Sequence, residues 1–242
     1  MKEAYLTIDD GPSIGRRKRV DVLKKYGIQA VWFSMGKDME ERPEDVVYTI
    51  ENGGIIGNHS YSHPNFSSLS LEQCQEEIAK TDKIIDEFYL KLGKNRPFKA
   101  FRFPYGNKGV EKAFYDYNYT KEERERVQSI QEIIKANGYT SYPFEGIHYK
   151  YYDNLIKQEH MDWYWTYDAM EWCIFQEKNQ YGIRTIDDVI ELMELDLPEQ
   201  WMGLQCDKSN EVVVIHDHKQ TIDTFEPIIQ GLIEHGIKFK TF

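Results

Sequence analysis

Short apolar segments alternate with longer amphipathic ones along the whole chain, and this alternation constrains the fold more than any other feature. The predicted strands are residues 4–8, 28–34, 54–58, 99–103, 163–167, 211–215 and 237–241. The predicted helices are residues 16–26, 43–52, 70–92, 120–137, 185–197 and 221–235. Because such alternation favours a parallel sheet covered by helices, we predict an α/β fold, open or closed into a barrel, with about seven strand–helix units.

The composition is typical of a soluble globular protein. The 242 residues are 40% hydrophobic, without an apolar run near the roughly 20 residues of a membrane span. No linker or repeat divides the chain, so residues 1–242 are treated as a single domain. The formal charge of −11 argues against nucleic acid and anionic membranes as partners, and nothing indicates a protein partner. The one basic run, Arg16-Arg17-Lys18-Arg19, is interpreted as the solvated start of a helix.

Cysteines and the N-terminus give little further information. Cys74, Cys173 and Cys206 are an odd number, far apart and without a CxxC pair, which argues against a disulfide framework or a cysteine zinc site. They are interpreted as packing residues. The first four residues lack the charged and apolar regions of a signal peptide. Either the protein stays in the cytoplasm or a leader has been removed, and the localisation is left open.

Two adjacent carboxylates follow the first predicted strand. They belong to the segment Asp9-Asp10-Gly11-Pro12. Neighbours in a strand point to opposite faces, but a turn at Gly11 can bring both carboxylates to one cavity. The alternative is a solvated turn in which aspartates make only local hydrogen bonds.

Two histidines follow the third predicted strand with a spacing typical of metal ligands. His59 and His63 stand at i and i+4, so one turn of chain places both imidazoles on one side. Because Pro64 disfavours the α conformation at His63, we expect a loop or a single turn there. A structural role for each histidine is the alternative.

Further reactive side chains end three later strands. Arg102 stands at a strand end and can orient a carboxylate by a bidentate pair, unless it is an ordinary surface arginine. His216 follows an apolar strand and is a candidate acid or base, and with His218 it is also a possible second metal pair. Asp168 and Glu171 are either a functional pair or the acidic first turn of a helix.

All these groups lie at the C-terminal ends of predicted strands, where α/β enzymes have their sites. Two histidines and a carboxylate give an incomplete coordination shell that leaves positions for water and substrate. A base beside such a metal, with an acid opposite, is the machinery of a hydrolase.

In combination and order, these residues resemble the NodB-type polysaccharide deacetylases, carbohydrate esterase family 4. The family's T-F-D-D-G-P, H-S/T-x-x-H and R-x-P-Y-G motifs are matched by residues 7–12, 59–63 and 102–106, and its L-x-H-D motif is approximated by residues 214–217. The D-x-x-D-W motif differs, because Glu171 replaces its second aspartate. The resemblance spans residues 4–241 and implies a distorted (β/α) barrel.

The resemblance also implies one divalent metal held by Asp10, His59 and His63. Zinc suits two imidazoles and a carboxylate. Cobalt, nickel or manganese are possible replacements, because metal selection depends partly on availability.

By the same resemblance, Asp9 is the general base and Arg102 pairs with it and aims it. His216 protonates the departing amine, because an amine anion is a poor leaving group. The backbone N–H of Tyr105 stabilises the oxyanion, a contribution of roughly 3–4 kcal/mol in comparable sites. Trp172 forms an apolar wall for the acetyl group or the sugar.

The substitution at Glu171 leaves one role open. A family carboxylate at this place tunes the acidic histidine, here His216, and the longer side chain makes Asp168 the alternative. His218 is expected to matter less than His216, because the family pattern places the acid at the first histidine after the strand.

The distance between the third and fourth motifs predicts a loop-rich insertion within residues 107–162. The insertion is rich in tyrosines, namely Tyr115, Tyr117, Tyr119, Tyr149, Tyr151 and Tyr152. These rings either stack on sugars at the mouth of the cleft or pack on the barrel.

The implied activity is metal-dependent removal of N-acetyl groups from amino sugars in a glycan of the chitin oligomer or peptidoglycan type. Two alternatives remain at this point. One is an O-acetyl esterase acting on xylan with the same site. The other is a carbohydrate-binding protein with little or no turnover.

Overall fold

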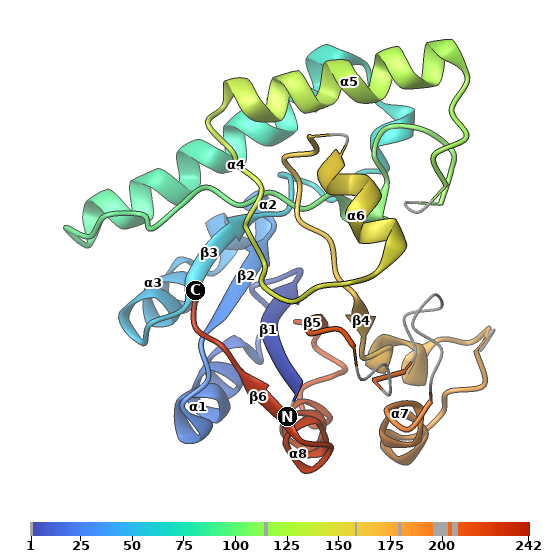
Figure 1. The fold of residues 1–242 in the computed structure, drawn as a ribbon. Helices are drawn as coiled ribbons and strands as arrows, with labels where there is room; N and C mark the ends of the chain where they lie inside the picture. Colours follow the sequence, from blue (N-terminus) through green and yellow to red (C-terminus); the bar gives the residue numbers. More distant parts are fainter. Residues whose placement is uncertain (1, 114–115, 158, 179–180, 196–202, 205–207) are drawn as a thin grey trace.

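The computed structural model describes residues 2–113, 116–157, 159–178, 181–195, 203–204 and 208–242 (Figure 1). Within them, parallel strands are hydrogen-bonded in the order β3-β2-β1-β5-β4, and β6 pairs with β1. The strands are β1 Lys2–Asp9, β2 Ala30–Ser34, β3 Ile55–Asn58, β4 Tyr167–Asp168, β5 Glu211–His216 and β6 Ile237–Phe239. The α/β class with parallel strands is therefore confirmed, with six strands in the described residues instead of about seven.

Two single contacts continue this sheet into a distorted barrel. Phe101 forms an isolated parallel bridge with Asn58 at the end of β3. Trp163 donates its backbone N–H to the carbonyl of Phe101 at 2.8 Å, and its segment runs on into β4 beside β5. The circuit of strands is thus closed where residues 101 and 163 meet.

The predicted strands 99–103 and 163–167 are wrong in extent, because the first is reduced to a single bridge at Phe101 and the second to the two-residue strand β4. The Arg102 side chain explains part of this difference. It donates to the carbonyls of Trp163 and Tyr164 at 3.1 and 3.4 Å, so a side chain uses acceptors that a strand ladder would otherwise use.

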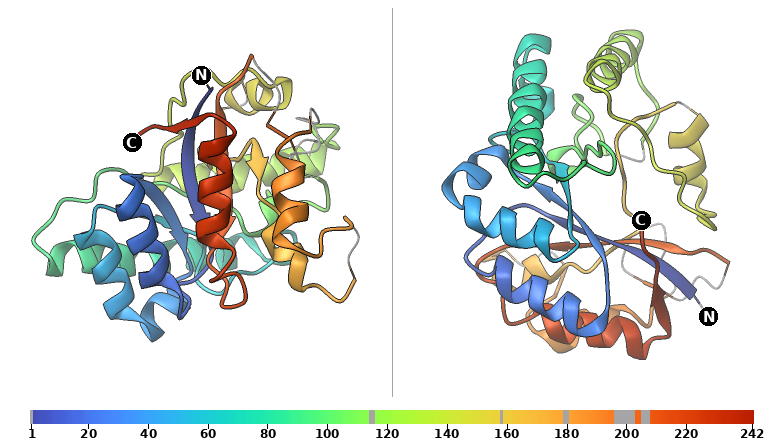
Figure 2. Two further views of the ribbon diagram at one scale, coloured as in Figure 1. Left: turned by 90° about the horizontal axis from the view of Figure 1, so that it is seen from below. Right: turned by 90° about the vertical axis from the view of Figure 1, so that its left-hand side faces the viewer.

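The helices flank the strands on two sides. They are α1 Arg16–Tyr26, α2 Gly36–Glu41, α3 Pro43–Glu51, α4 Leu71–Lys91, α5 Lys121–Ala136, α6 Lys150–Lys157, α7 Ile186–Leu192 and α8 Phe225–Glu234. Figure 2 shows α3, α1, α8 and α7 side by side outside the strands, whereas the long helices α4 and α5 lie together on another side. Capping boxes at Ser70 and Thr120 begin α4 and α5.

The helix predictions fail at short elements. The sequence did not predict α2 and α6, which are six and eight residues long. The predicted helix 185–197 ends at Leu192, and its last two residues lie outside the described part of the chain. None of the described helices is long and apolar enough to cross a membrane.

The main core lies between the strands and the outer row of helices. Leu6 and Ile8 of β1 and Val213 of β5 are fully buried there, together with Leu23 of α1 and Leu232 of α8. Because successive strand residues point to opposite faces, β1 also sends Thr7 and Asp9 toward the barrel interior. The core therefore fixes the direction in which β1 presents its functional end.

The tyrosines within residues 107–162 pack inside the protein, Tyr149, Tyr151 and Tyr152 against β5 and Tyr119 against α5. Tyr119, Tyr149, Tyr151 and Tyr152 are buried, and Tyr117 is partly buried. The rings of Tyr149 and Tyr151 stack at 5.6 Å, and the cluster that contains them includes a residue of β5. None of these five rings lines the large cleft described below, and Tyr115 lies outside the described residues.

Two smaller expectations have mixed outcomes. Cys74 and Cys173 are free and buried, which agrees with packing, and Cys206 lies outside the described residues. The basic run does begin a helix, but its solvation was wrongly predicted, because Arg16 and Arg19 are 0% exposed. The assignment of residues 1–242 to one domain with an insertion within 107–162 stays a prediction.

Candidate active site

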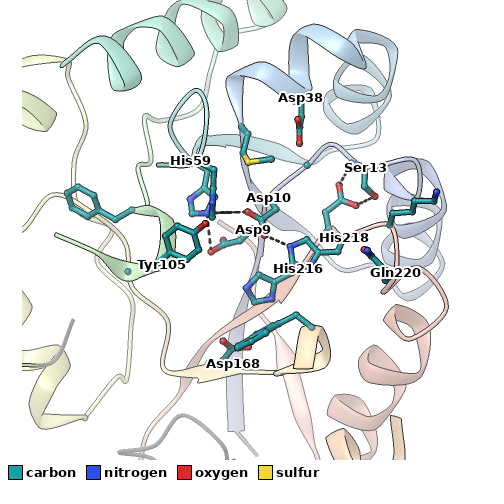
Figure 3. A pocket seen from close by; sticks show the side chains of 18 of the residues that line it. Asp9, Asp10, Ser13, Asp38, His59, Tyr105, Asp168, His216, His218 and Gln220 are labelled. Atoms are coloured by element: carbon teal, nitrogen blue, oxygen red, sulfur yellow. Dashed lines mark hydrogen bonds and ion pairs between the residues drawn. The ribbon is translucent and has the colours of Figure 1, made fainter. Parts of the chain in front are cut away.

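The end of β1 turns sharply and brings two neighbouring carboxylates to one cleft. Asp9 is the last residue of the strand and stands in register beside His216 of β5. Asp10 and Gly11 have φ angles of 71° and 67°, which reverse the alternation of the strand. Asp9 and Asp10 both line a cleft of about 1170 Å³, as the sequence suggested (Figure 3).

The loop after β3 carries the two histidines. His59 directly follows the strand and is 2% exposed. The loop is held by Glu77 of α4, whose Oε2 accepts the backbone N–H groups of Tyr61 and Ser62 at 2.8 Å each. His63 has a φ of 59°, so the segment is a turn and not a helix, as expected from Pro64.

Asp10 meets both histidines through one carboxylate oxygen. Its Oδ1 lies 3.6 Å from Nε2 of His59 and 3.2 Å from Nε2 of His63. These three residues form a group whose potential ligand atoms all lie within 4.8 Å of one another. Burial opposes ionisation of Asp10, but hydrogen bonds with His218 and His63 hold its pKa well below the usual range.

The tautomer of His59 fits a metal ligand. Its Nδ1 lies 2.9 Å from the carbonyl of Arg102, and a carbonyl can only accept, so this nitrogen carries the proton. Burial lowers the pKa of His59, which favours the neutral ring. The Nε2 lone pair then faces the Asp10 carboxylate, an arrangement that a cation between them would stabilise.

Arg102 pairs with Asp9 inside the barrel. Its guanidinium is 1% exposed and donates to Oδ1 of Asp9 at 2.6 Å and to the hydroxyl of Thr7 at 2.8 Å. The other Asp9 oxygen lies 4.0 Å from Nε2 of His59. The pairing inferred from the sequence is therefore present, but through one carboxylate oxygen and not as a bidentate pair, because Nη2 of Arg102 donates to the carbonyl of Tyr164.

Glu171 reaches His216. Its Oε1 lies 2.6 Å from the backbone nitrogen and 3.3 Å from the ring Nδ1 of His216. Burial alone would lower the pKa of His216, but the charge and hydrogen bond of Glu171, with the charge of Asp168, raise it to about 10. Burial, with the negative charge of Glu171 adding to it, raises the pKa of Asp168 to about 6. Both carboxylates lie near the ring, with Glu171 in contact.

Tyr105 lies beside His63, and Trp172 lies beside His216. Tyr105 has a φ of 57° in the short 3₁₀ segment η2 Pro104–Gly106, and its ring is 70% exposed. That ring stands edge-on to His63 at 4.5 Å between centroids. Trp172 belongs to the 3₁₀ segment η3 Glu171–Phe175, and its ring lies 6.3 Å from that of His216. Both residues line the cleft.

The sequence pattern gave no role to Asp217, a buried carboxylate that connects the loop after β5 with helix α1. Asp217 is fully buried and pairs with Arg16 at 2.5 Å and with Arg19 at 2.7 Å. It also accepts from Ser13, and a Cβ on Gly11 would come within 2.4 Å of its Oδ2. The signal was present, because Arg16 and Arg19 stand at i and i+3 on one helix face.

The sequence matches the polysaccharide deacetylase family over residues 1–121, half of the chain. The chain belongs to the polysaccharide deacetylase family. A peptidoglycan-N-acetylglucosamine deacetylase from Bacillus cereus is 35% identical to this chain over 105 residues. The matched segment is 43% of this chain and 36% of the Bacillus cereus protein. Peptidoglycan-N-acetylmuramic acid deacetylase PdaA from Bacillus subtilis is 28% identical over 207 residues, 81% of this chain and 74% of PdaA.

Solved structures share the fold of this family member. A family 4 carbohydrate esterase from Streptomyces lividans, in complex with acetate, has a TM-score of 0.63 and 21% identity over 99% of this chain and 92% of that one. A carbohydrate esterase family 4 pseudoenzyme from Bacillus anthracis has a TM-score of 0.60 and 18% identity over 98% of this chain and 63% of that one. Since a pseudoenzyme has this fold too, activity must be argued from the site.

Proposed function

We propose that this chain is a metal-dependent hydrolase that removes N-acetyl groups from amino sugars in a glycan of the peptidoglycan or chitin type. One observation carries the proposal. Asp10, His59 and His63 line one cleft together with Asp9 and His216, and the last two are held from behind by the buried side chains of Arg102 and Glu171. The names of the Bacillus relatives support an amino-sugar glycan as the substrate.

Asp10, His59 and His63 are the residues that would hold the metal, with zinc as the first choice. When bound, a divalent metal supplies Lewis acidity and makes water more acidic at neutral pH. The neutral Nε2 atom inferred for His59 and the ionised carboxylate of Asp10 support this assignment, because metal ligands must be deprotonated.

Asp9 is proposed as the general base. Its Oδ1 is held by Arg102, and its Oδ2 is left facing the histidine side of the cleft. A carboxylate fixed by a buried guanidinium cannot rotate away from the water whose proton it accepts. The backbone N–H of Tyr105, a residue whose ring stands beside that of His63, is proposed to stabilise the oxyanion.

His216 is proposed as the general acid that protonates the departing amine. With a pKa raised to about 10, the ring holds its proton at neutral pH. This supports N-deacetylation over O-deacetylation, because an alkoxide leaves more readily than an amine anion and needs less protonation. Trp172, near the same ring, is proposed as the apolar wall of the acetyl pocket.

The test compares three substrates on one preparation. Acetate release is measured with N-acetylated chitooligosaccharides, peptidoglycan fragments and acetylated xylan. The proposal predicts release from at least one of the N-acetylated glycans and less from xylan. Faster release from xylan would favour the esterase, and binding without release from any substrate would favour a carbohydrate-binding protein.

A further inference from the structure

The two oxygens of Asp10 have different neighbours. Oδ1 faces the two ligand histidines, whereas Oδ2 lies 2.6 Å from Nε2 of His218 (Figure 3). This is the shortest of the three histidine contacts that Asp10 makes. It comes from the loop after β5, on the opposite side of the carboxylate from the loop after β3.

The direction of this hydrogen bond is determined by its acceptor. A carboxylate that ligates a metal is deprotonated and can only accept a hydrogen bond. Nε2 of His218 must therefore carry the proton, and it has no lone pair for a metal. His218 acts on the carboxylate and not as a further ligand.

The backbone of His218 is anchored independently of its ring. Its carbonyl accepts from Nη2 of Arg19 at 2.6 Å and from the backbone N–H of Thr221 at 3.2 Å. The same guanidinium binds Asp217 at 2.7 Å through Nη1. The buried arginine thus fixes the loop from which the half-exposed imidazole reaches Asp10.

We propose that His218 is a positioning residue that holds Oδ2 of Asp10 and leaves Oδ1 for the metal. A carboxylate held at one oxygen can ligate through the other, which preserves coordination positions for water and substrate. This inference rests on the proposed metal-dependent function. The expectation from the sequence, that His218 matters less than His216, stays a prediction, and the proposal gives His218 a role of its own.

The experiment measures zinc affinity by competition with a chromogenic chelator. His218→Ala is expected to weaken binding by roughly 10–100-fold, the usual effect of losing an outer hydrogen bond to a ligand. His218→Gln, whose amide can still donate, should recover most of the affinity. His235→Ala is the matched control, because it breaks another histidine–carboxylate pair, with Glu194, outside the cleft. Its affinity should equal that of the wild type.

A spectroscopic readout separates positioning from ligation. X-ray absorption of the zinc-loaded protein should report two imidazoles in both the wild type and His218→Ala. Three imidazoles in the wild type and two in the variant would overturn the proposal, because His218 would then be a ligand.

The role of His218 and the proposed function can be refuted separately. Equal zinc affinity in wild type, His218→Ala and His218→Gln would overturn the role of His218 and leave the proposed function standing. A wild type that binds no zinc, cobalt, nickel or manganese would overturn the proposed function and this inference together.

Discussion

Glu171 contacts His216 twice through one oxygen, at 2.6 Å to the backbone nitrogen and 3.3 Å to the ring Nδ1. The longer side chain fits because Glu171 begins a 3₁₀ turn after Met170, which has a φ of 59°. Glu171 is 0% exposed, so its charge acts on the ring with little screening by water. The family's shorter carboxylate is thus replaced at this position by a glutamate on a local turn.

Glu171→Gln should move the alkaline limb of the pH profile to lower pH. The proposed acid works while His216 is protonated, so activity is lost as pH rises through its pKa of about 10. The amide removes the negative charge that raises this pKa, and we expect the limb to fall by roughly one to three pH units. The measurement is kcat/KM for acetate release between about pH 6 and about pH 11, a range that includes the titration of His216.

Asp168→Asn is the matched comparison for that substitution. Asp168 contributes to the raised pKa of His216 through its charge alone, whereas Glu171 contributes charge and a hydrogen bond. We therefore expect a smaller downward shift from Asp168→Asn. If the alkaline limb of the pH profile moves in Asp168→Asn but not in Glu171→Gln, then Asp168, and not Glu171, raises the pKa of His216.

Substitutions of the neighbours Asp9 and Asp10 should impair different properties of the enzyme. Asp9→Asn is expected to lower kcat by roughly 10²–10⁴-fold, the usual contribution of a general base, while zinc affinity stays near that of the wild type. Asp10→Asn should weaken zinc binding first, by more than about 100-fold, since even outer-shell partners contribute 10–100-fold. Equal loss of zinc in both variants would refute this division of roles.

His216→Ala should impair amide cleavage more than ester cleavage. An activated ester has a leaving group that needs little protonation, so a missing acid matters less there. The measurement compares kcat/KM on an N-acetylated oligosaccharide and on an activated acetyl ester, with wild type as reference. Similar fold losses on the two substrates would mean that His216 positions the substrate instead of protonating it.

Asp217→Asn should destabilise the fold. The substitution leaves the fully buried Arg16 and Arg19 without a counter-charge, which typically costs about 3–5 kcal/mol. The measurement is the free energy of unfolding in urea. The slope of that free energy against urea concentration should be the same as in the wild type. Lys18→Ala, which breaks a solvent-exposed pair with Asp223, is the control and should change little. A stability of Asp217→Asn equal to that of the control would show that the buried ion pairs of Asp217 with Arg16 and Arg19 do not stabilise the fold.

The sequence predicted the parts of the site that follow from strand ends. Asp9, His59 and His216 stand where parallel strands finish, and the carboxyl ends of such strands meet at one edge. The elements β1, α1 and β3 were predicted to within about two residues for the same reason, because their apolar spacing and flanking glycines are strong local signals. The bounds of these elements could therefore be predicted from the local sequence alone.

The remaining parts depend on contacts between distant residues. Arg16 and Arg19 look like solvated cations until Asp217, about 200 positions later, is placed between them. The contact of His218 with Asp10 and the use of backbone carbonyls by Arg102 are long-range in the same way. Periodicity reports which face a residue occupies but not which buried partner it meets there.

The central claim is that this chain removes acetyl groups from an N-acetylated glycan by means of a metal at Asp10, His59 and His63. The most direct test measures acetate release from N-acetylated chitooligosaccharides and peptidoglycan fragments before chelation, after chelation, and after one equivalent of zinc is restored. The account predicts that release stops on chelation and returns with zinc in the wild type, but does not return in Asp10→Asn. Release that persists in the fully chelated protein, or no release from the zinc-loaded wild type, would contradict it.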